Sequence, residues 1–341
     1  MIEFIDAYSE KWDLYLNEFG KDKLDIYYTK EYCRLYENDI SKAYLFVYKD
    51  KNNIGIYPMM KTLITGYEEI KNYYDIETPY GYGGPLVNTD DEKFIHEFEE
   101  NFIGFCSSNR IIAEFVRFHP VLKNHNIFKK NINVDFNRNT ILVKLGKDID
   151  RVWNEDISSK NRNMIRKAEK NNLKIEVVKE YKSFIQIYDD TMKKVNASSF
   201  YYFDEMYYKN ILDIDGINIF NVKYEEKTIA SAIFMKYNGH FHYHLAGSKK
   251  EYLNIAPNNF LLWEAIKYAY ENKCDNFHLG GGTDSSLENS LYKFKKSFSN
   301  NEMKFFIGKR IHNKEVYKNL IDLWKIKNNK NSKLFLQYKE K

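Results

Sequence analysis

Apolar residues in the first half of the chain come in short runs separated by polar turns. Such runs are typical of strands. We expect strands at 43–48, 53–61, 67–75, 111–116 and 139–145, and helices at 7–18, 30–37 and 92–109. A turn-rich segment runs from Glu77 to Pro85 as Glu-Thr-Pro-Tyr-Gly-Tyr-Gly-Gly-Pro. The pattern predicts a mixed α/β arrangement.

The second half has a clearer order of elements and starts near residue 150. We expect helices at 152–172, 181–195, 204–213, 257–271, 289–296 and 314–327. We expect strands at 173–178, 217–224, 228–237, 240–246, 276–279 and 303–309. Tight turns at Glu225-Glu226 and Asn238-Gly239 join three successive strands. The order is therefore a helix pair, an antiparallel meander and a β-α-β crossover. The first half shows a similar order less clearly.

The chain has 341 residues, which suits two domains better than one. No low-complexity linker separates the halves. We therefore expect two closely packed domains, 1–149 on the acceptor side and 150–341 on the donor side. The charged end of the chain, 327–341, is the segment that we expect to fray.

Charge and cysteine content narrow the class of protein. The formal net charge is only +4, which is weaker than in domains that coat nucleic acid. The three cysteines lie far apart, which favours a reducing compartment over a disulfide framework or structural zinc. The N-terminus has no basic leader, and no stretch reaches the ~18 apolar residues of a membrane-spanning helix. We expect a cytoplasmic enzyme and leave peripheral membrane association open.

Four motifs in the last hundred residues give the sequence a specific resemblance. They are Tyr243-His-Leu-Ala-Gly-Ser248, Ala256-Pro257, Phe277-His-Leu-Gly-Gly281 and the Leu-Tyr-x-Phe-Lys-x-x-Phe run at 291–298. Together they resemble the FemX and FemABX aminoacyltransferases of the GNAT acyltransferase superfamily. The resemblance implies an α/β fold of two tandem GNAT-like domains. It also implies transfer of an amino acid from aminoacyl-tRNA to an amine of a peptidoglycan precursor, without a tightly bound cofactor.

The sequence also departs from that pattern. His278 stands where the family usually has Asp, and the Gly-rich loop by which ordinary GNAT enzymes hold the CoA pyrophosphate is missing before Pro257. Three functions therefore stay open. The first is aminoacyl transfer to an envelope precursor, the second is CoA-dependent acyl transfer to an amino sugar, and the third is an inactive GNAT-like binding module.

The resemblance implies a site around the Phe294-Lys295 pair. A lysine in a cleft can stabilise an oxyanion or protonate a leaving group, whereas a solvated lysine beside Lys293 and Lys296 would do neither. The resemblance also places Tyr243, Gly281 and Gly282 in the substrate site. The N–H groups of the loop that contains these two glycines could bind an anion. The alternative for the loop is an ordinary flexible turn.

Three histidines alternate on one expected strand, at His240, His242 and His244. Alternate residues of a strand lie ~6–7 Å apart, too far to share one ion comfortably, so we expect no metal site. His242 or His244 could accept a proton from an ammonium substrate. Ordinary histidines on a polar sheet face are the alternative.

Further candidate binding residues are charged or aromatic and lie outside these motifs. The basic helix offers Lys160, Arg162, Arg166 and Lys167 for the phosphates of tRNA or of a nucleotide sugar, unless this is a solvated face. In the first half, the resemblance points to Arg34 for substrate phosphates. Tyr80, Tyr82 and Arg117 are further substrate-binding candidates, and the alternative is turn packing with a satisfied arginine.

Overall fold

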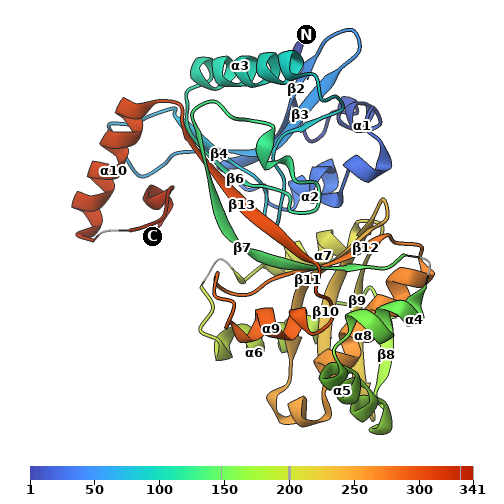
Figure 1. The fold of residues 1–341 in the computed structure, drawn as a ribbon. Helices are drawn as coiled ribbons and strands as arrows, with labels where there is room; N and C mark the ends of the chain where they lie inside the picture. Colours follow the sequence, from blue (N-terminus) through green and yellow to red (C-terminus); the bar gives the residue numbers. More distant parts are fainter. Residues whose placement is uncertain (147, 199–200, 331, 341) are drawn as a thin grey trace. The chain divides into compact units, whose positions relative to one another are not determined.

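The computed structural model describes residues 1–146, 148–198, 201–330 and 332–340. Contacts divide the chain into two compact units (Figure 1). The first unit joins Met1–Asn137 with Lys304–Lys341, and the second is Arg138–Met303. The C-terminal segment thus packs with the first half, which the expected domain limits of 1–149 and 150–341 do not anticipate. Those limits stay a prediction.

The first unit is built on a mixed sheet with strand order β1-β2-β3-β4-β6-β13. Among the described strands of this unit, β4 and β6 pair in parallel, and short β5 adds to β3. The strands are β1 Ile2–Asp6, β2 Ser41–Lys49, β3 Ile54–Leu63, β4 Tyr74–Glu77, β5 Leu86–Val87, β6 Ile111–Arg117 and β13 Glu302–Ile311. The N-terminal strand β1 was not expected from the sequence.

Amphipathic helices cover this sheet. The helices are α1 Lys11–Leu16, α2 Lys30–Arg34, α3 Glu92–Ser108 and α10 Lys314–Asn328. Phe94, Phe98, Phe102 and Cys106 recur every four residues on α3, so that they form one buried stripe. On α10, Leu320 and Trp324 join a second apolar cluster together with Tyr338 from the end of the chain.

The expectation that the C-terminal tail frays is wrong for its described residues. Tyr338 is buried, and Lys339 pairs with Asp75 and Glu77 at 2.8 and 2.7 Å. The indole Nε1 of Trp324 also donates to the Glu340 carbonyl. These contacts tie the tail to β4 and α10, which the count of charged residues could not show.

The second unit has strand order β7-β12-β11-β10-β9-β8. Of the strands described in this unit, β11 and β12 pair in parallel. The strands are β7 Ile132–Lys144, which enters this unit at Arg138, β8 Lys174–Val178, β9 Ile217–Tyr224, β10 Lys227–Tyr237, β11 His240–Ser248 and β12 Asn276–Gly281. Asn238 and Gly239 both have positive φ in the β10–β11 turn, as a tight hairpin turn requires.

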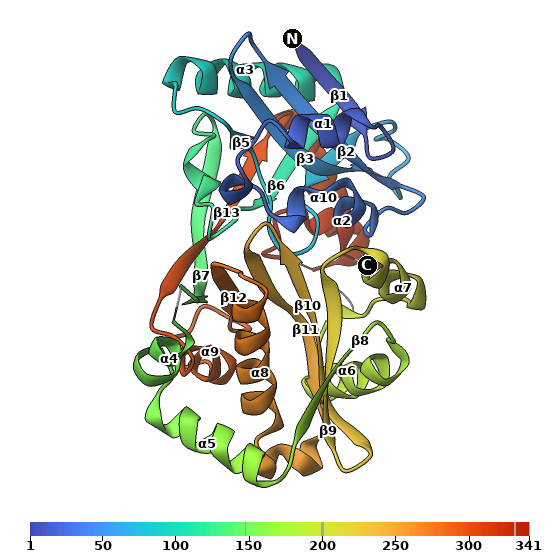
Figure 2. The ribbon, with the colours of Figure 1, turned by 90° about the vertical axis from the view of Figure 1, so that its right-hand side faces the viewer.

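Helices lie on both faces of this second sheet (Figure 2). On one face are α6 Lys182–Lys194 and α7 Glu205–Asp213, and on the other are α5 Ser159–Lys170, α8 Pro257–Glu271 and α9 Ser290–Lys296. The helix expected at 152–172 is broken, because Ser158 accepts a hydrogen bond from the Asn161 N–H and starts α5 there. In the described ranges, no helix is long and apolar enough to cross a membrane.

Candidate active site

The two parallel strands of the second unit, β11 and β12, separate part of the way along their length. β11 and β12 pair only from His240–His242 with Asn276–His278. Beyond this point β11 continues beside β10 to Ser248, while Gly280 and Gly281 of β12 pair with β7. The two strands therefore separate after His242 and His278, and the side chain of Lys295 on α9 reaches residues of both.

Lys295 is held between the separated strands. Its Nζ donates to the Gly281 carbonyl of β12 at 2.8 Å and lies 5.5 Å from the ring centroid of Tyr243 on β11. The residue is only 7% exposed. Lys293 and Lys296 are exposed and form ion pairs with Glu288 and Glu302. The structure thus separates Lys295 from its two neighbouring lysines.

Packing of α9 fixes where Lys295 can reach. The Asn289 side chain accepts hydrogen bonds from the Leu291 and Tyr292 N–H groups and so caps the helix. Tyr292 and Phe298 belong to the buried core of this unit, and Phe294 packs against it. Phe294 therefore anchors the helix, and its neighbour Lys295 is directed into the site.

The charge of Lys295 is perturbed by its surroundings. Burial and, to a smaller extent, the nearby positive charge of Arg138 together lower the pKa of its ammonium group to about 7. At neutral pH the amine is therefore present in both protonation states. Sequence reasoning did not single out Arg138, which lies on β7 in the loosely matching part of the chain.

The glycine loop makes its contacts to these cations through carbonyl groups. Lys295 contacts the Gly281 carbonyl, and Arg138 Nη1 donates to the Gly282 carbonyl at 2.6 Å. A Cβ on Gly281 would lie 2.8 Å from the Asn139 carbonyl oxygen, and one on Gly282 would lie 2.5 Å from the Asn289 side chain. Glycine is thus needed at both positions. These contacts favour a loop that orients cations, and they lend no support to an anion cradle of loop N–H groups.

His240 and His242 lie on the opposite face of β11 from Tyr243, as strand alternation requires, whereas His244 stands at a β-bulge in the pairing of β11 with β10. His242 pairs in register with His278, whose Nε2 is 2.9 Å from Thr140 Oγ1. His244 Nε2 is 2.7 Å from the Tyr207 hydroxyl. Burial, with a smaller effect of His242, lowers the pKa of His244 to about 3. A base this weak, already hydrogen-bonded to Tyr207, is a poor acceptor for an ammonium proton.

The basic helix α5 does not present its cations uniformly. Arg162 Nη1 donates to the carbonyls of Trp153, Asn154 and Ile157 at 3.1, 3.0 and 2.5 Å. This geometry favours a structural role for Arg162 over phosphate binding. Arg166 is exposed and lies 5.5 Å from the Trp153 ring. Lys160 and Lys167 are exposed, so these three remain candidates for phosphate contact.

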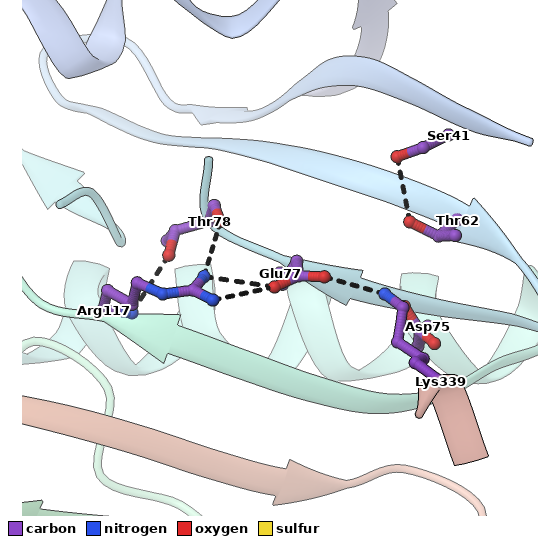
Figure 3. Close-up of polar contacts among 7 residues, drawn as sticks. All are labelled: Ser41, Thr62, Asp75, Glu77, Thr78, Arg117 and Lys339. Atoms are coloured by element: carbon purple, nitrogen blue, oxygen red, sulfur yellow. Dashed lines mark hydrogen bonds and ion pairs between the residues drawn. The ribbon is translucent and has the colours of Figure 1, made fainter. Parts of the chain in front are cut away.

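In the first unit, Arg117 is held in an ion-pair network (Figure 3). Its guanidinium donates twice to Glu77 at 3.1 Å and once to the Thr78 carbonyl at 2.9 Å. Burial opposes ionisation of Glu77, but Lys339 and Arg117 outweigh it and lower the pKa of this carboxyl to about 2. Arg117 is therefore a satisfied strand-end arginine, as in the alternative interpretation, and its contacts do not favour a substrate role.

The other first-unit candidates pack among aromatic residues. The Tyr82 ring meets Tyr27, His119 and Phe305 edge-on, while the Tyr80 ring stacks on Tyr36. Arg34 is exposed and its guanidinium lies 4.8 Å from the Tyr8 ring centroid. These contacts are those of turn packing, and substrate binding by Arg34, Tyr80 and Tyr82 stays a prediction.

Known proteins resemble this chain in sequence. Residues 159–296 match the Acetyltransferase (GNAT) domain family. The UDP-N-acetylmuramoylpentapeptide-lysine N(6)-alanyltransferase of Weissella viridescens is 31% identical over 122 residues. That match covers 35% of this chain and 35% of the relative, so it spans about a third of either protein.

Solved structures resemble the chain over almost its whole length. FemX matches with a TM-score of 0.70 at 13% identity, over 94% of this chain and 99% of that one. The C-terminal domain of a putative lysylphosphatidylglycerol synthetase from Agrobacterium fabrum matches with a TM-score of 0.57 at 14% identity, over 92% and 94%. The expected resemblance to FemX is confirmed, and so is the α/β fold with two tandem GNAT-like domains.

Proposed function

We propose that the chain is a transferase that moves an aminoacyl group from aminoacyl-tRNA to an amine of a cell-envelope precursor. The observation that carries the proposal is the buried Lys295, held between Gly281 and Tyr243. The named activity of the Weissella relative, alanyl transfer to a lysine of a peptidoglycan precursor, supports the choice of substrate class.

The position and pKa of Lys295 suit aminolysis of an ester. The acceptor amine must lose a proton to attack the ester carbonyl, and the bond to the leaving oxygen must then break. Neutral Lys295 can take that proton, because its pKa is lowered to about 7. The resulting ammonium stabilises the oxyanion and returns the proton to the leaving hydroxyl, so that amide and alcohol are the products.

The start of α8 favours aminoacyl-tRNA over CoA as donor. Ordinary GNAT enzymes hold the CoA pyrophosphate with a Gly-rich loop at the corresponding helix start, and backbone N–H groups at a helix start are suited to bind phosphate. Here Pro257 occupies the first helical position and has no N–H to offer. The Asn258 side chain donates to Ser248 Oγ at the same place. The exposed cations Lys160, Arg166 and Lys167 would contact the tRNA backbone.

Two other functions remain as alternatives to be tested. A CoA-dependent acyltransferase acting on an amino sugar would use the same Lys295 chemistry on a thioester. An inactive binding module would have no use for a buried Lys295, because burial of its ammonium group costs stability and no activity would offset that cost. The low exposure of Lys295 thus favours an enzyme.

Localisation and cofactor requirement belong to the same proposal. We place the enzyme in the cytoplasm, where aminoacyl-tRNA is available, in peripheral contact with the membrane at the envelope precursor. Catalysis by Lys295 needs neither a metal nor a bound cofactor.

Parallel incubations separate the three functions. The purified chain is given radiolabelled alanyl-tRNA, seryl-tRNA or acetyl-CoA, together with an extract of envelope precursors. We expect label to pass from an aminoacyl-tRNA to an acid-stable product. Transfer from acetyl-CoA alone would establish the second function, and no transfer from any donor would favour the binding module.

A further inference from the structure

Two cations hold adjacent carbonyl groups of one loop. Lys295 Nζ donates to the Gly281 carbonyl at 2.8 Å, and Arg138 Nη1 donates to the Gly282 carbonyl at 2.6 Å. The side chain of Arg138 also passes close to Gly281, where an added Cβ would lie 2.9 Å from Arg138 Cδ. Arg138 and Lys295 therefore share one short segment of backbone, although they lie on β7 and α9.

We propose that Arg138 is a positioning residue for Lys295 in the transfer reaction. By holding Gly282 it fixes the direction of the preceding carbonyl, which in turn fixes the Lys295 amine. Its own charge is permanent, since a guanidinium stays protonated at any physiological pH. The claim that Arg138 assists the transfer reaction rests on the proposed function. The claim that Arg138 orients the Lys295 amine and adjusts its pKa does not.

The charge of Arg138 has a second effect. A permanent cation beside an amine disfavours the protonated amine, and this adds to the effect of burial in lowering the pKa of Lys295. Among the residues that the structure describes, Tyr243 on β11 also faces Lys295; burial raises its pKa, so that it stays neutral. On α9 itself, Lys293 and Lys296 are neutralised by Glu288 and Glu302. Arg138 is therefore the charged residue that adjusts the Lys295 amine.

Two substitutions of Arg138 distinguish the effect of its charge on the Lys295 pKa from the effect of its shape. In Arg138→Met the positive charge is lost, and the Lys295 titration midpoint should rise by on the order of one pH unit. In Arg138→Lys the charge remains, and the midpoint should stay close to that of the wild type. Arg151→Met is the matched control, because Arg151 also holds a carbonyl at β7, that of Lys144 at 2.6 Å, without a contact to Lys295.

NMR titration of the full chain labelled with [13C]lysine measures this midpoint directly, with the Lys295 signal assigned by its loss in Lys295→Met. The proposal is overturned if Arg138→Met leaves the midpoint unchanged, or if Arg138→Met and Arg138→Lys shift it equally. In an active preparation, the acid limb of the kcat profile should move with the midpoint. Because the titration needs no substrate, a failed transfer assay would count against the proposed function alone.

Discussion

Lys295, which we propose acts in the transfer step, is buried at a cost to stability. Its folded pKa of about 7 lies below its ordinary value of 10.5, so the folded state holds fewer protons than the unfolded state between these pH values. The cost to the folded state grows as pH falls from about 10.5 to about 7 and is constant below that. A neutral residue of similar length at this position should remove the cost and so raise the stability of the folded state.

We therefore predict that Lys295→Met raises the Tm by a few degrees at pH 6–7, with a gain that shrinks as pH rises toward 10. Differential scanning calorimetry across that range checks it. Lys293→Met, which removes an exposed ion pair with Glu288, should change the Tm little at any pH. A lower Tm for Lys295→Met at pH 6 would mean that the amine stabilises the fold.

Arg162 shows the opposite case, in which an apparent binding residue is structural. Arg162→Ala would leave three carbonyls that lie between Trp153 and Ile157 without their donor. We predict a loss of about 1–3 kcal/mol in the free energy of unfolding. Arg166→Ala should cost less than about 0.5 kcal/mol and should instead weaken tRNA binding. Urea titration and filter binding measure the two effects, and equal stability losses would contradict this division.

The sequence could identify Lys295 and its motif but could not identify the partners of arginine side chains. Phe294-Lys295 was found because the motif spans neighbouring residues. Arg117 meets Glu77 from forty residues away, and Arg138 meets Gly282 from 144 residues away. Contacts of such separation depend on tertiary packing, and no local pattern reports them.

At the scale of the elements, hydrophobic periodicity predicted most helices and strands of the second unit to within a few residues. The helix at 257–271 coincides with α8, and in the first unit the helix at 314–327 coincides with α10 except for one residue. The long helix at 152–172 was wrong, because the cap at Ser158 outweighs its helical pattern. β1 was missed because five half-exposed residues at a chain end give little periodic signal.

The tail after α10 offers a test at this scale. Lys339 contacts both Asp75 and Glu77, and Asp75 is completely buried. Lys339→Met would remove the cation beside Asp75, and we predict a loss of about 1–3 kcal/mol in stability at pH 7. Burial raises the pKa of Asp75, so the loss should shrink as pH falls and this carboxyl becomes protonated.

Urea titrations at pH 7 and pH 5 measure that loss. Lys333→Met is the control, because Lys333 is exposed in the same tail. If both variants are as stable as the wild type, the ion pairs of Lys339 contribute nothing to the stability of the first unit.

At the scale of the whole molecule, the resemblance to FemX concerns fold, and the chemistry depends on a few residues. At 13% identity the match to FemX establishes how the chain is arranged and leaves substrate choice open. The folding units also differ from the expected domains, because Lys304–Lys341 joins the first unit. The order of elements along the sequence could not reveal this, since β13 pairs with β6 across almost two hundred residues.

The transfer rate of Lys295→Met tests the central claim most directly. Single-turnover transfer from the donor that the parallel incubations identify is compared for Lys295→Met, Lys293→Met and Lys296→Met. We predict that Lys295→Met alone lowers the transfer rate by about 10²–10³, or about 3–4 kcal/mol, with donor and acceptor binding nearly unchanged. If all three variants retain the wild-type rate, or all three lose it equally, Lys295 is part of a basic surface and has no special role in transfer.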